Sequence, residues 1–308
     1  MSTQPSRERR ERFIGLAFST GAFLFWGLSP PYWKLLGHAP AFQVFAHRVI
    51  WACAFTACVV TVQKRWGEVK ASFRSRKTVL TLLASGIFIA GNWSIYIIGV
   101  LRGQLVSVSL GYFINPLVSV LLGVLVLRER LRFWQIVAVL FAFSGVLYLS
   151  LGLKGLPWIS LALAFSFGLY GLLRKTVAVE SIPGTFIESL LVSPLVLAYL
   201  LVAGIRGQSV FGTADAVTHL LLIGSGVVSA LPIIWFANGA RRIPLSLVGF
   251  LQYLAPTCQL LIGIFLFGEE FSRTHLISFG LIWSGIIIFT ASTLLRRNVR
   301  SPAGDVEP

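Results

Sequence analysis

The sequence predicts an all-α integral membrane protein whose ten transmembrane helices form two inverted five-helix repeats, with both termini in the cytoplasm. Three observations lead to this prediction. The 308 residues are 56% hydrophobic and 12% charged, with a mean hydropathy of +0.82, whereas a soluble domain carries about 25% charged residues. Loops rich and poor in Lys and Arg alternate along the chain. The second half of the chain repeats features of the first.

Ten apolar segments are long enough to cross a membrane, since a helix needs about 20 apolar residues to do so. The first segment follows a basic tail, as in a signal peptide, but no small-residue cleavage site comes after it. It is therefore predicted to be a transmembrane helix. The predicted spans are residues 13–32, 42–62, 78–100, 105–127, 133–150, 157–173, 185–204, 216–238, 245–267 and 275–293.

The distribution of Lys and Arg predicts the orientation in the membrane. Over alternate loops and tails, 20 of these residues fall on one side and five on the other, while Arg48 lies within a span. The richer side faces the cytoplasm by the positive-inside rule, which places both termini there. The net charge of +15 thus reflects topology, and the lipid bilayer is the predicted partner rather than a nucleic acid.

An internal duplication appears when the chain is shifted by 140 positions. The segment Ser109–Arg130 then falls on Gly249–Glu270 without a gap. Matching glycines, prolines and charged residues in one register indicate a true repeat, which is sought before any other fold assignment. The matches include Pro116 with Pro256, Gly123 with Gly263, Glu129 with Glu269, Gly99 with Gly239 and Arg102 with Arg242.

The duplication divides the chain into a basic tail at 1–12, a first repeat at 13–150, a second repeat at 157–293 and a tail at 294–308. Each repeat holds five spans, an odd number, so the second repeat enters the membrane from the opposite side. Inverted repeats of this kind are typical of secondary transporters, whose substrate site lies near the midplane where the repeats meet.

The sequence lacks the common catalytic and nucleotide-binding motifs. It has no phosphate-binding loop of the form G-x-x-x-x-G-K-[ST], no H-E-x-x-H and no G-x-S-x-G. The three cysteines, Cys53, Cys58 and Cys258, all lie in apolar spans and imply neither a disulfide nor a metal framework. We therefore predict no enzymatic activity, no cofactor and no metal.

Three ionisable residues lie within spans, where charge is costly unless it faces a cavity or a partner. They are His47, Arg48 and Glu188. Arg48 and Glu188 are equivalent in the two repeats, and inversion places equivalent positions near opposite faces. We expect Arg48 to line an outer vestibule and Glu188 an inner one, with roles for all three in gating or proton coupling. The alternative is that they snorkel or bond to backbone carbonyls.

Prolines predict helix breaks at Pro116 and Pro256, because each leaves the carbonyl four residues earlier without its usual donor. Such breaks are tolerated in a membrane where they face protein or a cavity. We expect a central cavity between spans three, four, eight and nine, suited to a small organic solute or, through ring faces, a cation. Alternatively, the aromatic residues pack between helices. The predicted cavity residues are Trp26, Asn92, Trp93, Tyr96, Tyr112, Asn115, Tyr170, Trp235, Asn238, Gln252 and Tyr253.

Several stretches resemble the drug/metabolite transporter superfamily, in particular EamA-domain permeases of the RarD type. They are FLFWGLSPPYWKLL (23–36), HRVIW (47–51), GNW (91–93), SLGYFINPL (109–117), LAFSFGLYGLLRK (163–175), IES (187–189) and GFLQYLAPT (249–257). The resemblance extends over about residues 13–293. Gly268 departs from it, since it stands where the first repeat has a basic residue.

The resemblance implies a multi-pass permease of the bacterial inner membrane that moves a small organic metabolite or drug by alternating access, with export favoured over uptake. A non-transporting membrane receptor or assembly partner is the main alternative, and an intramembrane enzyme acting on lipids is another. The substrate, the direction, the coupling ion and the oligomeric state stay open at this point.

Overall fold

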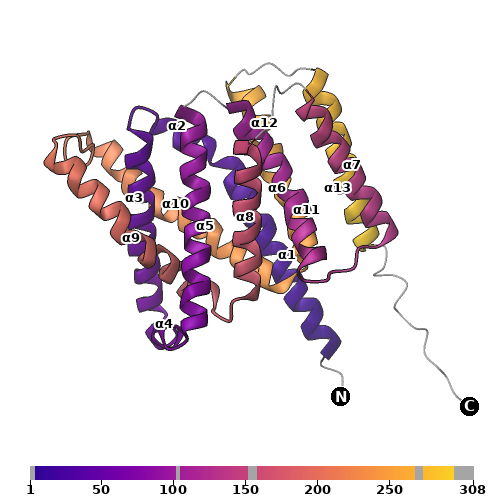
Figure 1. Cartoon of the computed structure of the whole chain (residues 1–308), viewed down its shortest axis with the longest axis horizontal. Coiled ribbons are helices and arrows are strands. Elements are labelled where there is room, and N and C mark those ends of the chain that lie inside the picture. The colour runs from indigo at the N-terminus through magenta and orange to yellow at the C-terminus, as the bar shows by residue number, and fades with distance from the viewer. Residues whose placement is uncertain (1–3, 102–104, 152–157, 268–272, 295–308) are drawn as a thin grey trace, which may run out of the picture.

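The computed structural model describes residues 4–101, 105–151, 158–267 and 273–294 (Figure 1). Regular structure in these ranges is entirely helical. The helices are α1 (Gln4–Leu28), α2 (Pro30–Leu35), α3 (Ala41–Val62), α4 (Trp66–Phe73), α5 (Arg76–Leu101), α6 (Leu105–Leu125), α7 (Phe133–Ser150), α8 (Trp158–Thr176), α9 (Ser181–Ile205), α10 (Ala216–Arg242), α11 (Leu245–Gln252), α12 (Leu254–Phe267) and α13 (Arg273–Leu294).

Within these ranges, seven helices are long and apolar enough to cross a membrane: α1 with α2, α3, α5, α7, α9, α10 and α13. Helix α6 supplies a shorter apolar stretch, Leu110–Leu125. Helix α1 begins at Gln4, so helical structure extends into the segment predicted to be a basic tail. The predicted C-terminal tail lies almost wholly outside the described residues.

The two predicted proline breaks have different outcomes. The span around Pro256 is divided at Tyr253 into α11 and α12, next to the Gln252 carbonyl that the proline cannot bond. The break predicted at Pro116 is wrong, because α6 continues through this residue. A proline removes one main-chain hydrogen bond, and close packing of α6 against α8 and α11 holds the helix together despite that loss.

Helices that are equivalent in the two repeats pack against each other. Helix α3 contacts α9, α6 contacts α11, and α7 contacts α13. Two further contacts, α1 with α10 and α5 with α8, are equivalents of one another under the repeat. Figure 1 shows the α7–α13 pair at one end of the molecule and α3 with α9 at the other. This pattern is what a two-fold relation between the repeats produces.

Glycines allow the closest helix contacts. A Cβ atom on Gly226 of α10 would lie 2.5 Å from the Trp51 carbonyl oxygen of α3, closer than side-chain carbons approach backbone. Similarly, a Cβ atom on Gly249 of α11 would lie 2.7 Å from the Pro116 carbonyl oxygen of α6. These glycines therefore set the spacing between the repeats.

Gly226→Ala is expected to lower the free energy of unfolding by about 1–3 kcal/mol, because the added methyl group forces α3 and α10 apart. Unfolding of the purified protein in mixed micelles with increasing SDS measures the change. Gly204→Ala is the matched control, since Gly204 is also helical and no described atom lies within 4 Å of its would-be Cβ. Equal stability of the two variants would contradict this interpretation.

Polar contacts join the helices at the end of the bundle where α1 begins. Glu129 accepts hydrogen bonds from the backbone N–H groups of Leu245 (2.6 Å) and Ser246 (2.9 Å) and so caps α11. Lys175 donates to the Ala240 (3.0 Å) and Ile243 (2.6 Å) carbonyls at the end of α10. The negative charge of Glu129 lies at the N-terminus of α11 and the positive charge of Lys175 at the C-terminus of α10, and each sign is favourable at that end of a helix dipole. They fix α8, α10 and α11 relative to one another.

Candidate functional site

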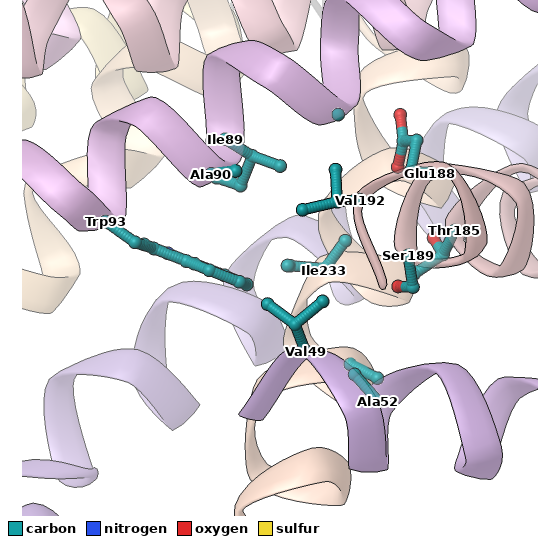
Figure 2. Close-up of a pocket in the computed structure, with 12 residues that line it drawn as sticks. Val49, Ala52, Ile89, Ala90, Trp93, Thr185, Glu188, Ser189, Val192 and Ile233 are labelled. Carbon is teal, nitrogen blue, oxygen red and sulfur yellow. The ribbon is translucent and has the colours of Figure 1, made fainter. Parts of the chain in front are cut away.

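A pocket lies between α3, α5, α9 and α10, with an empty volume of about 390 Å³ that includes its open mouth. Its walls are mainly apolar, as in most small-molecule sites. Figure 2 shows Trp93 and Glu188 on opposite sides of it, with Val49, Val192 and Ile233 between them. The lining residues are Val49, Ala52, Gly86, Ile89, Ala90, Trp93, Thr185, Glu188, Ser189, Val192, Ala230 and Ile233.

The pocket draws on equivalent positions of the two repeats. Helices α3 and α5 are the second and third spans of the first repeat, and α9 and α10 are their equivalents in the second. Eight of the twelve lining residues form pairs at a shift of 140 positions: Val49 with Ser189, Ala52 with Val192, Ala90 with Ala230, and Trp93 with Ile233. The pocket therefore lies where the two repeats meet.

Glu188 belongs to a buried polar cluster at one side of the pocket. Its carboxylate accepts a hydrogen bond from the Ser85 hydroxyl of α5. The Arg174 guanidinium of α8 lies 3.6 Å from it. The side chain of Arg174 is 0% exposed and that of Glu188 is 4% exposed. Breaking such a buried pair is expensive, because the remaining charge keeps neither water nor a counter-ion.

The Arg174 guanidinium fits closely into its surroundings. Its Nη2 atom donates to the Ser181 carbonyl at 3.1 Å. A Cβ atom on Gly184 would lie 2.9 Å from Arg174 Cζ, so only glycine leaves room for the guanidinium there. The Nε and Nη1 atoms have no hydrogen-bond partner among the described residues. The cluster is thus only partly satisfied by hydrogen bonds, and its stability depends on the opposite charges of Arg174 and Glu188.

Arg48 lies on α3 next to Val49 of the pocket lining but is not itself a lining residue. Its Nε atom donates to the Ser229 hydroxyl of α10 at 2.9 Å. The guanidinium carbon lies 4.4 Å from the ring centroids of both Trp33 and Trp93, so the cation is held between two indole faces. Arg48 and Glu188 thus have different partners.

His47 neighbours Arg48 in sequence but has different surroundings. Its ring lies 5.0 Å from that of Phe211, in the connection between α9 and α10. Its Nε2 atom is buried without a hydrogen-bond partner among the described residues. His47 is not among the residues that line the pocket. Its assignment to gating or proton coupling therefore has no support from the position of the pocket.

Four predicted cavity residues with amide side chains lie outside the pocket lining. Asn92 donates to the Leu163 carbonyl of α8 at 2.8 Å and so joins two helices. Gln252 donates to the Ser119 hydroxyl at 2.9 Å across the α6–α11 contact. Asn238 accepts from Arg242 at 2.8 Å near the end of α10. Asn115 is buried, and its Oδ1 atom has no partner among the described residues.

Trp93 is the predicted cavity aromatic that lines the pocket. Trp26 packs between Phe167 (5.7 Å between ring centroids) and Phe236 (6.1 Å). The remaining five predicted residues also lie outside the pocket lining. Tyr170 stacks on Phe236, Trp235 meets Phe25 of α1, and Tyr253 joins the cluster that contains Phe279. Tyr96 faces Tyr112 with 6.2 Å between ring centroids.

The pocket therefore differs in position from the predicted cavity. Spans three and eight do line the pocket, but spans two and seven replace spans four and nine. Spans four and nine, α6 and α11, pack tightly on each other through Gly249 and leave no room between them. The rotation of a helix that is apolar on every side cannot be deduced from its sequence, because no polar stripe marks the buried face.

Sequence analysis missed four residues at this site: Ser85, Ser229, Trp33 and Arg174. Ser85 belongs to a Ser-Gly pair that repeats as Ser225-Gly226, which indicated the duplication but not a function. Arg174 follows the predicted span 157–173 and so falls with Lys175 in a predicted loop, whereas it lies inside α8 and is fully buried. The signal available was Glu188 itself, since a buried acid requires a counter-ion.

The fold and the pocket define a class of protein. Apolar helices long enough to cross a membrane form two related repeats, and a small, largely apolar pocket with one buried ion pair lies between them. Membrane transporters have this combination of repeats and a shared site. No group of three or more metal-ligating side chains occurs within the described ranges.

Comparison with known proteins gives the family. The EamA-like transporter family matches residues 13–151 and again 153–291. The chain belongs to this family and is a membrane transporter of the drug/metabolite type. Protein RarD of Streptomyces exfoliatus is 40% identical over 289 residues, covering 94% of this chain and 91% of that protein. The uncharacterized transporter YojE of Bacillus subtilis (strain 168) is 43% identical over 281 residues, covering 90% and 94%.

A solved crystal structure supports the fold independently. It superimposes with a TM-score of 0.74 and covers 93% of this chain and 99% of its own. Sequence identity is 18%, so the likeness concerns the fold alone.

A more distant relative, the chloramphenicol-sensitive protein RarD of Pseudomonas aeruginosa, is 31% identical over 292 residues, covering 93% of this chain and 97% of the relative.

Proposed function

We propose that this protein is a secondary transporter that moves a small organic metabolite or drug across the bacterial inner membrane by alternating access, in the direction of export. The observation that carries the proposal is the composition of the pocket, which pairs equivalent residues of the two repeats. In an inverted-repeat transporter, a site at that position is exposed to either side when the repeats exchange conformations.

We further propose that the chain crosses the membrane ten times, as two inverted repeats with both termini in the cytoplasm. The contacts between equivalent helices support this arrangement, with α11 and α12 together forming the ninth crossing. The beginning of α1 and the basic segment around α4 lie at one end of the bundle, and α2 lies at the other (Figure 1). That common end is the one that the positive-inside rule assigns to the cytoplasm.

Glu188 is the proposed coupling residue. It lines the pocket, and its charge is opposed by Arg174 of a different helix. Protonation of Glu188 would remove its attraction to Arg174 and so weaken the contact between α9 and α8. Proton binding and substrate binding in the pocket would then affect the same pair of helices. The proposal therefore links proton binding to helix movement through one named ion pair.

Ala90→Trp is expected to reduce flux at least about tenfold, because the indole fills a pocket that the substrate must enter. Flux is measured in liposomes that contain the purified protein, with a panel of metabolites and drugs. Leu195→Trp is the matched control, since Leu195 is 79% exposed on the outside of α9. Flux that Ala90→Trp leaves unchanged would contradict transport through this pocket, and no flux of any compound by the unaltered protein would favour a receptor.

A further inference from the structure

Arg48 is half-buried and, unlike the fully buried Arg174, has no acidic partner among the described residues. None of the ion pairs among the described residues involves it. Its Nε atom is bonded to Ser229, and that hydroxyl in turn donates to the Ser225 carbonyl at 2.6 Å. A charge within a membrane helix marks a functional site unless a partner neutralises it. Arg48 therefore carries a positive charge that no acid among the described residues balances.

The groups around Arg48 are suited to an anion. One ring face of Trp33 and one of Trp93 already lie against its guanidinium, so these two faces are not available to a cationic substrate. Tyr96 and Tyr112 lie near Arg48, and their hydroxyls can donate hydrogen bonds. A guanidinium and two phenols form a set of donors without an acidic acceptor. That set matches the oxygens of a carboxylate.

Comparison of the two repeats supports the same conclusion. At the shift of 140 positions, Glu188 corresponds to Arg48 and Arg174 corresponds to Lys34. The second repeat therefore holds an acid and a base that neutralise each other. The first repeat has cations at both positions, and Lys34 is exposed on α2. The duplication has thus kept charge at these positions but left the first repeat without an acid at either of them.

We propose that Arg48 binds the carboxylate of an organic anion whose apolar body lies against Trp93 in the pocket. This inference rests on the proposed transport function and names the class of its substrate. Val49, Ala90 and Ile233 supply the apolar surface beside Trp93 (Figure 2). Arginine suits this role because its planar fork matches a carboxylate with two parallel hydrogen bonds.

Binding of matched compounds tests the inference. The probes are benzoate with benzamide, and indole-3-acetate with indole-3-acetamide, each titrated against purified protein while the thermal unfolding midpoint is followed. In at least one pair the anion is expected to bind about tenfold or more tightly than its neutral amide, as charge-assisted hydrogen bonds predict. Arg48→Gln is expected to abolish that preference, and Arg48→Lys to retain part of it. Arg206→Gln, which removes an exposed cation outside the pocket, is expected to keep it.

The inference is overturned if neither anion is preferred over its amide, or if folded Arg48→Gln protein keeps the preference. Should Arg48→Gln fail to fold, Arg48→Lys and Tyr112→Phe decide the matter, since both keep the positive charge and are expected to weaken anion binding. Because the assay measures binding, it is independent of flux. Flux in liposomes without any anion preference would overturn this inference alone, whereas anion binding without flux would overturn the transport proposal alone.

Discussion

Arg174→Gln is expected to lower the free energy of unfolding by about 3–5 kcal/mol, the range found when one member of a buried ion pair is removed. The guanidinium is fully buried, and Glu188 beside it is 3% exposed. Without Arg174, the carboxylate would keep its hydrogen bond from Ser85 but no counter-ion. Gln is shorter than Arg and leaves space next to Gly184 as well.

The double variant Arg174→Gln with Glu188→Gln distinguishes lost charge pairing from lost packing. If charge pairing dominates, the double variant is more stable than either single variant, because it leaves no uncompensated charge. SDS-driven unfolding in mixed micelles measures all three proteins. Arg206→Gln serves as the control for removing an exposed cation. Additive losses from the two substitutions would mean that Arg174 and Glu188 do not interact.

The fold could be predicted from the sequence to the extent that hydropathy, charge and repetition specify it. Seven of the predicted spans fall on helices that are long and apolar enough to cross a membrane, and the other three fall on α6, α8 and α11 with α12. An apolar segment satisfies its backbone hydrogen bonds within a membrane by forming a helix. The break before Pro256 could also be predicted, but the same argument was wrong for Pro116. The two prolines differ in packing, which depends on helix neighbours and not on local sequence.

The candidate site was predicted less well. Trp93 and Glu188 were among the predicted residues and line the pocket, because aromatic and charged residues are conspicuous in an apolar chain. Residues such as Val49 and Ile233 that form the pocket walls have no distinguishing chemistry, so sequence gives no reason to select them. Arg174 was misplaced because a cation near a helix end is normally solvated. Its burial follows from the position of Glu188 on a helix distant in sequence.

Glu188→Gln is expected to abolish the response of flux to a pH gradient while leaving a gradient-independent flux. In the unaltered protein, a proton on Glu188 would cancel its attraction to Arg174, so a gradient would change how often α8 and α9 separate beside the pocket. Glutamine resembles the protonated acid in shape and cannot release a proton. Flux in liposomes is therefore expected to rise with the gradient in the unaltered protein and to be indifferent to it in the variant.

Because Glu188→Gln leaves Arg174 unpaired, the double variant with Arg174→Gln provides a more stable protein for the same measurement. Both variants are expected to lose the gradient response, since both lack the titratable group. Glu68→Gln is the control for removing an acid, since Glu68 lies on α4 and pairs with Arg65 away from the pocket. A gradient response that persists in the double variant would assign proton coupling elsewhere. Flux of the unaltered protein that is indifferent to the gradient would make the protein a facilitator, in which Arg174 and Glu188 hold α8 to α9 without carrying protons.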